Sequence, residues 1–259
     1  MQSISRLFWA LLLAHLLADF PLQTDLIVER KRNTVLGYAE HGIIHLIVLE
    51  LCLAIFTSVS LVSPFIQITL AGYVLLHLVI DYVKRFLIQR RSVQDSTLSF
   101  LIDQAAHIAT ICALVYVVAR LSWPAERWNL NLPNVPRDRL LITGVTYVAV
   151  IFVGGYLIRY LTRPMSQKLE ARKETPDELR NAGLYIGWLE RFLILTAILI
   201  QSPAMVGLIL TGKSIVRFPE AKEPRFAEYF LIGTFLSMSI AIIGGLILAR
   251  AIYGSVTFK

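Results

Sequence analysis

The five histidines of this chain follow one spacing rule that is typical of metal ligands. Each histidine has an Asp or a second His four residues away. Positions i and i+4 lie on one face of an α-helix, one turn apart, so the two side chains of a pair can bind a single ion. We therefore interpret eight residues as candidate metal ligands on four successive helices: the pairs His15/Asp19, His41/His45, His77/Asp81 and Asp103/His107.

The place of each pair within its apolar segment predicts that all four pairs lie at one depth. Consecutive membrane spans alternate in direction, so a shared site must come late in the first and third spans and early in the second and fourth. The pairs have this order. We expect a deeper and a shallower tier one helical turn apart, which suits two ions or one ion with an outer shell. The deeper tier is His15, His45, His77 and His107, and the shallower tier is Asp19, His41, Asp81 and Asp103.

The donor types indicate which cofactor to expect. Imidazole and carboxylate groups favour a divalent transition metal, with Zn as first choice and Mn, Fe, Co or Ni as alternatives, over Ca or Mg. Cys52 and Cys112 lie singly in apolar segments, which argues against a thiolate site. Haem between two His is a weaker alternative because it gives no reason for the paired Asp.

The alternative without a metal is a network of neutral His and Asp side chains that hydrogen-bond the helices together. Each of three Asp at membrane depth costs about 2.5–3.5 kcal/mol. Metal coordination supplies about 10–16 kcal/mol in small sites, and hydrogen bonding would not require four matched pairs. We therefore favour the metal site.

Three further polar residues extend the helix faces that carry the pairs. Gln23 continues the face of His15, Lys84 continues the face of His77, and Gln104 adjoins Asp103. We expect these residues to line the cytoplasmic mouth as substrate contacts. In the alternative interpretation, Lys84 extends to lipid headgroups and both Gln side chains pack between helices. For catalysis, the candidates are the three carboxylates, as ligands or proton acceptors: Asp19, Asp81 and Asp103.

The composition predicts the elements that must position these residues. Hydrophobic residues make up 56% of the 259 residues and charged residues 17%, whereas a soluble domain has about 25% charged residues. Blocks of about 20 apolar residues are the length of a membrane-spanning helix. We predict an all-α integral membrane protein with about eight transmembrane helices, at 5–22, 40–61, 65–88, 97–119, 139–160, 184–201, 203–217 and 227–251.

Two of these predictions have alternatives. The first segment resembles a signal peptide in length, but it has no convincing cleavage site and contains His15 and Asp19, so we expect a retained span. The segments 184–201 and 203–217 are short and meet near Pro203, so one of them is a candidate for a tilted or re-entrant helix.

The predicted domains are a four-span metal-binding bundle at 1–120, an outer loop at 121–138 and a second four-span domain at 139–259. The second domain includes a charged cytoplasmic segment at 163–182. Most of the 25 Lys and Arg residues fall in the odd-numbered connections, which predicts that those connections are cytoplasmic. Both termini would then lie outside, with the metal site toward the cytoplasm.

The net charge of +7 could suggest a nucleic-acid partner, but the basic residues do not gather on one face. The basic residues lie in short connections between apolar segments, which argues against a nucleic-acid partner and for anionic membrane lipids. The charges within the second half, such as Glu190 and Arg191, we interpret as structural pairs or as side chains that extend to headgroups. The oligomeric state is left open.

The ordered motifs of residues 5–115 also carry a resemblance to a known family. They resemble bacterial multi-pass membrane proteins of an uncharacterised family, and they are loosely similar to bacterial inner-membrane proteins described as metal-dependent hydrolases. The resemblance implies a location in the inner membrane and a hydrolytic reaction, without a substrate. The motifs are His15-Leu-Leu-Ala-Asp19-Phe-Pro-Leu-Gln23, His41-Gly-Ile-Ile-His45, His77-Leu-Val-Ile-Asp81 and Asp103-Gln104-Ala-Ala-His107.

Three function hypotheses follow. The leading one is a metal-dependent hydrolase at the cytoplasmic leaflet, acting on a lipid or a lipid-linked phosphate or ester. The second is a divalent-metal transporter or sensor, which would need a polar path to the outer side; the apolar stretches 7–14 and 70–76 argue for a dead-end site instead. The third is a structural or regulatory membrane subunit with a stabilising metal.

Overall fold

The computed structural model describes residues 4–122, 136–170, 182–217 and 224–254. Much of the predicted outer loop 121–138 and of the predicted cytoplasmic segment 163–182 lies outside the described residues. The chain divides into two compact units, residues 1–145 and 146–259, which we describe separately. The helices of the first unit are α1 (Ile4–Asp19), α2 (Asp25–Asn33), α3 (Val35–Phe56), α4 (Pro64–Gln89), α5 (Thr97–Ser122) and most of α6 (Pro136–Val148).

All regular elements in the described residues are helices, as the sequence predicts. Five stretches are long and apolar enough to cross a membrane. This finding indicates a multi-pass membrane protein. The predicted spans 5–22, 184–201 and 203–217 are not among the five, and α1 and α9 (Ala204–Arg217) have only 16 and 14 residues. The number of eight spans therefore stays a prediction. The five stretches are Val35–Phe56, Pro64–Gln89, Thr97–Leu121, Arg137–Ser166 and Ala227–Tyr253.

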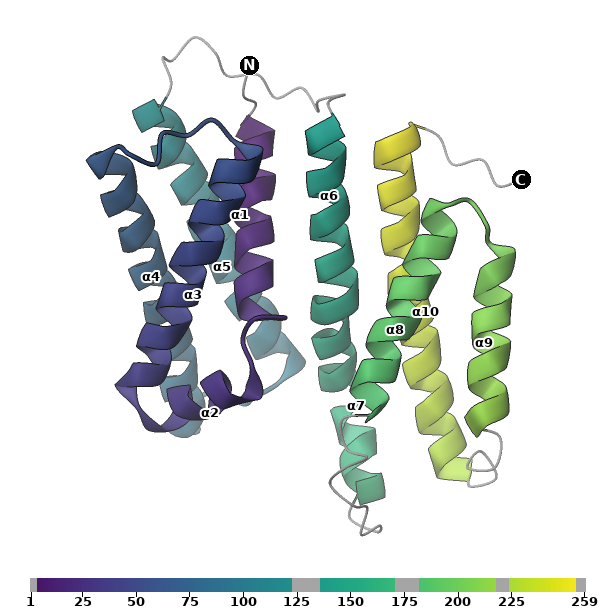
Figure 1. The fold of residues 1–259 in the computed structure, drawn as a ribbon. Helices are drawn as coiled ribbons and strands as arrows, with labels where there is room; N and C mark the ends of the chain where they lie inside the picture. Colours follow the sequence, from purple (N-terminus) through teal and green to yellow (C-terminus); the bar gives the residue numbers. More distant parts are fainter. Residues whose placement is uncertain (1–3, 123–135, 171–181, 218–223, 255–259) are drawn as a thin grey trace. The chain divides into compact units, whose positions relative to one another are not determined.

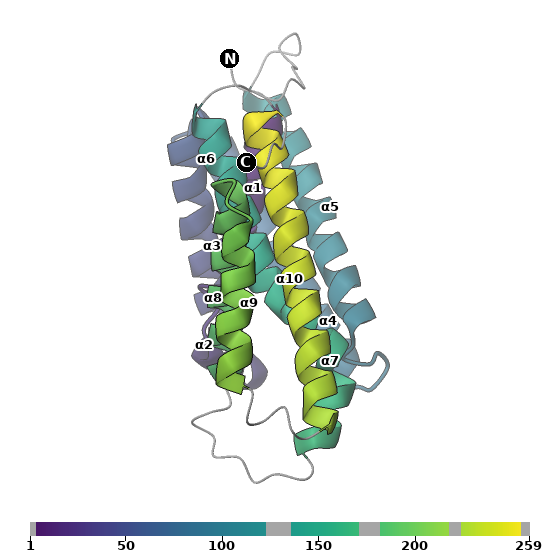
Figure 2. The ribbon, with the colours of Figure 1, turned by 90° about the vertical axis from the view of Figure 1, so that its right-hand side faces the viewer.

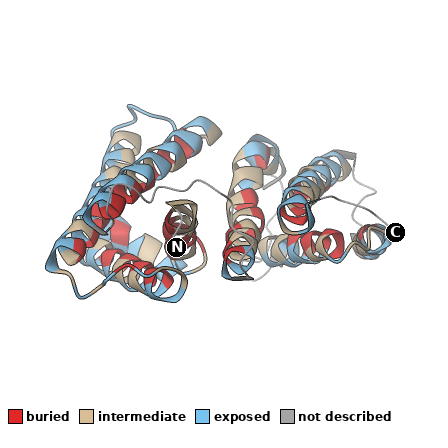
Figure 3. Cartoon of the chain, turned by 90° about the horizontal axis from the view of Figure 1, so that it is seen from above, coloured by how far each residue is buried: buried red, intermediate tan, exposed pale blue. Residues whose placement is uncertain are grey.

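Four helices of the first unit form a closed bundle. Around the ring, α1 packs on α3, α3 on α4, α4 on α5, and α5 on α1 (Figures 1 and 2). Buried residues face the interior of the bundle, as Figure 3 shows from above. The outer face of α3 instead exposes an apolar stripe at four-residue spacing, which is typical of a helix in contact with lipid. The stripe consists of Ile43, Ile47, Leu51 and Ile55.

A short helix, α2, closes one end of this bundle (Figure 1). It packs against α3, and Thr34 separates the two helices, its hydroxyl accepting a hydrogen bond from the amide of Gly37 at 3.4 Å. Gly37 allows the close approach, because a Cβ atom there would lie 2.3 Å from the backbone nitrogen of Lys31. The connection predicted between the spans 5–22 and 40–61 thus contains a helix, α2, and α3 begins at Val35 instead of at residue 40.

The first unit also includes the start of α6. Arg6 of α1 binds Asp138 of α6 through two hydrogen bonds, from Nε to Oδ1 at 2.5 Å and from the second guanidinium nitrogen to Oδ2 at 2.9 Å. Asp138 is buried. The N-terminal ends of α1 and α6 therefore lie at the same end of the unit.

The second unit consists of the continuation of α6, the π-helical turn η2 (Ala149–Val153), α7 (Gly154–Glu170), α8 (Ala182–Leu199), α9 and α10 (Pro224–Tyr253). Helix α10 packs on α7 and α8, and α9 packs on α8. The core holds aliphatic residues of α8, α9 and α10, such as Ile194, Leu195, Val206 and Ala241. Gly245 of α10 lets that helix approach Ile198 of α8 closely.

Two buried charged side chains of the described part of the second unit, Glu190 and Arg191, have polar partners: an ion pair for Glu190 and neutral hydrogen-bond acceptors for Arg191. Lys213 donates to Glu190 Oε2 at 2.6 Å. Arg191 donates from two nitrogens to the carbonyl of Ile151, at 3.1 and 2.8 Å, and from a third to Ser237 Oγ at 3.2 Å. These contacts agree with the interpretation of the charges as structural.

We expect Gly245→Ala to destabilise the second unit. The added Cβ would lie 2.8 Å from Ile198 Cβ, and overpacking of this kind typically costs about 1–3 kcal/mol. The unfolding temperature of the detergent-purified variant should fall. Gly233→Ala, on the same helix with open space around its Cα, is the matched control and should leave the unfolding temperature unchanged or raise it. Equal effects of the two substitutions would contradict the packing described.

Candidate metal centre

The four predicted pairs meet inside the N-terminal bundle. All five histidines are at most 2% exposed, and all eight predicted residues fall into three overlapping groups that could hold a metal ion. Within each group the donor atoms lie within 4.8 Å of one another. The groups are His15, Asp19, His45 and His77; His41, His77 and Asp81; and Asp81, Asp103 and His107.

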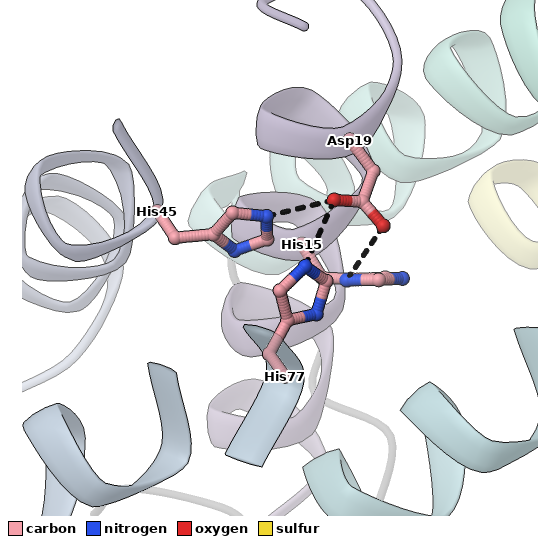
Figure 4. Close-up of side chains that lie close together, drawn as sticks. All are labelled: His15, Asp19, His45 and His77. Atoms are coloured by element: carbon pink, nitrogen blue, oxygen red, sulfur yellow. Dashed lines mark hydrogen bonds and ion pairs between the residues drawn. The ribbon is translucent and has the colours of Figure 1, made fainter. Parts of the chain in front are cut away.

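Asp19 lies at the centre of the first group (Figure 4). Its Oδ1 is 2.7 Å from His45 Nε2 and 3.2 Å from His77 Nε2, while its Oδ2 is 3.6 Å from His15 Nδ1. His41 Nε2 also lies 3.2 Å from Oδ1. One carboxylate of α1 thus faces imidazoles from three helices, α1, α3 and α4.

Two further carboxylates continue the cluster toward α5. Asp81 Oδ2 lies 3.6 Å from His41 Nε2 and 3.8 Å from His77 Nε2, and Asp81 Oδ1 lies 3.4 Å from His107 Nε2. Asp103 Oδ1 is 3.6 Å from the same His107 nitrogen. Because His77 and Asp81 each belong to two groups, the eight residues form one connected cluster rather than separate sites.

The groups combine the two predicted tiers. The first and third groups join deeper histidines to shallower carboxylates, because an imidazole reaches far enough to meet a carboxylate one turn along its own helix. The nitrogen–oxygen distances of these same-helix pairs are 3.6 Å for His15/Asp19, 3.8 Å for His77/Asp81 and 3.6 Å for Asp103/His107. The donor atoms therefore gather in groups that span both tiers, rather than in one group for each tier.

Several donor atoms of the cluster are buried and have no hydrogen-bond partner in the described part of the chain, which is what the ligands of a cation would show. Among the described residues, both ring nitrogens of His15 and of His107, Nδ1 of His41 and of His77, and Oδ1 of Asp103 have no hydrogen-bond partner. An unsatisfied buried polar group costs about 1–3 kcal/mol. Among the eight cluster residues, two hydrogen bonds are formed: His45 to Asp19 at 2.7 Å and His41 to His77 at 3.3 Å. A closed hydrogen-bond network is therefore absent from this part of the described chain, and the donor set fits a metal ion.

Lys31 borders the cluster at Asp81. Its ammonium group donates a hydrogen bond to Asp81 Oδ2 and lies 5.4 Å from the centre of the Tyr38 ring. Gln23 lies beside it: with its amide oxygen toward Lys31, Gln23 accepts from Nζ at 2.8 Å and donates to the carbonyl of Asp19 at 2.9 Å.

Lys84 borders the cluster at Asp103. Its ammonium group donates to Asp103 Oδ2 at 2.8 Å and lies 5.9 Å from the centre of the Phe100 ring. Gln104 Nε2 donates to the same Asp103 oxygen at 3.2 Å. The three predicted substrate contacts, Gln23, Lys84 and Gln104, thus all lie at the edge of the cluster, and Lys84 is directed toward Asp103.

Lys31 is the residue at this edge that the sequence does not single out. It belongs to a basic run, Arg30 to Arg32, that is typical of a cytoplasmic connection, and no periodicity distinguishes it from its neighbours. Arg30 faces elsewhere and pairs with Glu40 at 2.5 Å. Only the packing of α2 on Gly37 brings Lys31 to the carboxylate of Asp81.

One family model matches the part of the chain that contains the cluster. Residues 7–131 match the family model described as "Protein of unknown function (DUF3307)". The expected resemblance to an uncharacterised family is therefore confirmed for this part of the chain, which contains all eight cluster residues. The likeness to metal-dependent hydrolases stays a prediction. No match was found among curated proteins or among solved structures.

We expect His77→Ala to remove bound metal, because His77 belongs to two of the three groups. Loss of an outer partner of a metal ligand already lowers affinity about 10–100-fold, so loss of a ligand should cost at least as much. Elemental analysis of detergent-purified protein would measure metal per chain. Tyr73→Phe, one turn away on α4, removes only a hydroxyl and should keep the metal. Equal metal content in wild type and His77→Ala would argue against the centre.

Proposed function

We propose that this protein is a membrane-embedded, metal-dependent hydrolase that acts at the cytoplasmic leaflet on a lipid or a lipid-linked substrate. The observation that carries the proposal is the buried cluster of five His and three Asp, with lysines at its edge. A divalent ion at such a cluster acts as a Lewis acid that activates water and polarises the bond to be broken. Zinc is our first choice for one or two ions.

The position of each residue in the cluster suggests whether it binds the metal or accepts a proton. The five histidines and Asp19, at the centre of the cluster, are placed to hold the metal. Asp81 and Asp103 lie at its edge, and the Asp81 side chain is 16% exposed, against 8% for Asp19 and 6% for Asp103. Asp81 is therefore the best candidate to accept a proton from the attacking water.

The proposed topology has eight spans with both termini outside. The ion pair between Arg6 and Asp138 puts the N-terminal ends of α1 and α6 at one end of the first unit, which supports four crossings between them, by α1, α3, α4 and α5. Helix α2, at the other end, carries three basic residues in its last turn, as a cytoplasmic segment would. The cluster then faces the cytoplasm. A place in the bacterial inner membrane rests on the resemblance stated above.

A lipid substrate is supported by an apolar groove beside α2. The groove has a volume of about 430 Å³ and lies between α2 and α3. It is open and shallow, and its apolar lining residues are Leu26, Ile27, Ile43 and Ile44, with Thr24, Arg30 and Glu40 as its polar ones. An acyl chain from the bilayer could lie along the apolar part. Helix α2 borders the groove with Leu26 and Ile27 and the cluster with Lys31, so the acyl chain and the headgroup of one lipid would both contact this helix.

A transport function is less well supported by the bundle interior. Large aliphatic side chains that are at most 2% exposed fill the bundle on the side away from α2: Leu7, Leu11, Leu49, Leu53, Leu70 and Ile111. This packing argues for a site open to one side, as an enzyme needs, rather than for a path across the membrane.

The direct test is hydrolysis by zinc-loaded protein in lipid nanodiscs, against a panel of phosphate monoesters, phosphate diesters, carboxylic esters and amides. We expect turnover that a chelator abolishes. Asp81→Asn should lower it by about 10²–10⁴-fold, while Glu228→Gln, which changes an exposed carboxylate on α10, should not. No turnover in the whole panel would overturn the proposal. Metal uptake into proteoliposomes would then favour a transporter, and a loss of thermal stability alone on metal removal would favour a structural role.

A further inference from the structure

The two lysines at the edge of the cluster have matching environments. Each ammonium group donates to a carboxylate of the cluster, Asp81 for Lys31 and Asp103 for Lys84. Each lies over an aromatic ring. A Gln side chain contacts one member of each ion pair: Gln23 accepts from Lys31 Nζ, and Gln104 donates to Asp103 Oδ2. The two lysines come from different helices, α2 and α4. The contact between an ammonium group and a carboxylate of the cluster therefore occurs at two places on its edge.

The lysines change the charge of the cluster once a metal is present. With neutral imidazoles, the three carboxylates exceed the two ammonium groups by one negative charge. A single divalent ion therefore makes the cluster positive, and a second ion makes it more so. Net charge away from water is costly unless an opposite charge compensates it. Without the lysines, three carboxylates would have a net charge of −1 with one divalent ion and +1 with two. The two ammonium groups raise these values to +1 and +3, which favours an added anion.

Both ammonium groups also have hydrogen-bonding capacity to spare. An ammonium has three donors. In the described chain Lys31 contacts Asp81 and Gln23, and Lys84 contacts Asp103. At least one donor on each lysine can therefore bind a further acceptor without loss of the contacts to the carboxylates.

We propose that the group recognised by this centre is a phosphate, held by Lys31 and Lys84 beside the metal. The inference rests on the proposed function and narrows its substrate to phosphate esters. A phosphate has enough oxygens to contact a metal and both ammonium groups together, whereas a carboxylate has two. Lysine is a common point-charge partner of phosphate.

The phosphate can belong to a lipid headgroup or to a soluble phosphate ester. The apolar groove next to α2 predicts a lipid. Dioctanoyl phosphatidic acid should then bind more tightly than glycerol phosphate to the zinc-loaded protein. Equal affinities would overturn the assignment to a lipid and leave a soluble phosphate ester as the source.

Binding of inorganic phosphate to zinc-loaded protein in detergent, measured by titration calorimetry, tests the lysines. Loss of a charge-assisted hydrogen bond should raise the dissociation constant at least about tenfold in Lys31→Gln and in Lys84→Gln. The matched control is Arg32→Gln: Arg32 follows Lys31 on α2 and is exposed, so the affinity of this variant for phosphate should stay within about twofold of wild type. Zinc content, measured for every variant, should be unchanged.

Three results would overturn the inference. The lysines would have no part in binding if both Gln variants bound phosphate as wild type does. If wild type bound acetate as tightly as phosphate, the substrate class would be wrong. If the Gln variants lost zinc together with phosphate, the lysines would serve only to hold the carboxylates. Failure of the proposed function is distinguishable from all three, because it is measured separately: wild type that binds zinc and phosphate would then turn over no substrate of the panel.

Discussion

The need to compensate eight polar side chains inside an apolar helical bundle constrains the whole N-terminal unit. Its five histidines are almost fully buried, and several of their ring nitrogens lack a partner among the described residues. In a bilayer no water is at hand to satisfy such groups. Four helices have to present their pairs at one depth, and a cation bound among them would offset the cost that the hydrogen bonds within the cluster leave uncompensated.

The same constraint accounts for the helix that closes the bundle. Asp81 and Asp103 lie at the edge of the cluster and each receives an ammonium group, from Lys31 and Lys84. Lys31 reaches Asp81 because Gly37 lets α2 lie directly against α3. The ion pairs at the edge of the cluster and the close backbone packing at the end of the bundle are therefore two parts of one arrangement.

The sequence predicted the cluster well because its signal is local. A spacing of four residues and the order of the pairs along alternating spans are enough to bring the eight residues of the cluster together. Lys31 and the Arg6–Asp138 pair could not be found in this way. Each depends on helices that meet only in the folded chain, and Asp138 falls in a stretch whose Pro and polar residues are typical of a loop. The prediction begins the second span at residue 40, whereas α3 begins at Val35, because Gly37 and Glu40 interrupt the apolar run at the start of the helix.

X-ray absorption of the purified protein at the edge of its bound metal tests the central claim most directly. A zinc ion in this cluster predicts a shell of nitrogen and oxygen ligands at about 2.0–2.2 Å, with multiple scattering from imidazole rings and no sulfur at about 2.3 Å. The signal should disappear when His45 and His77 are both replaced by alanine. A protein without a bound transition metal, or a metal whose spectrum shows no imidazole, would contradict the account.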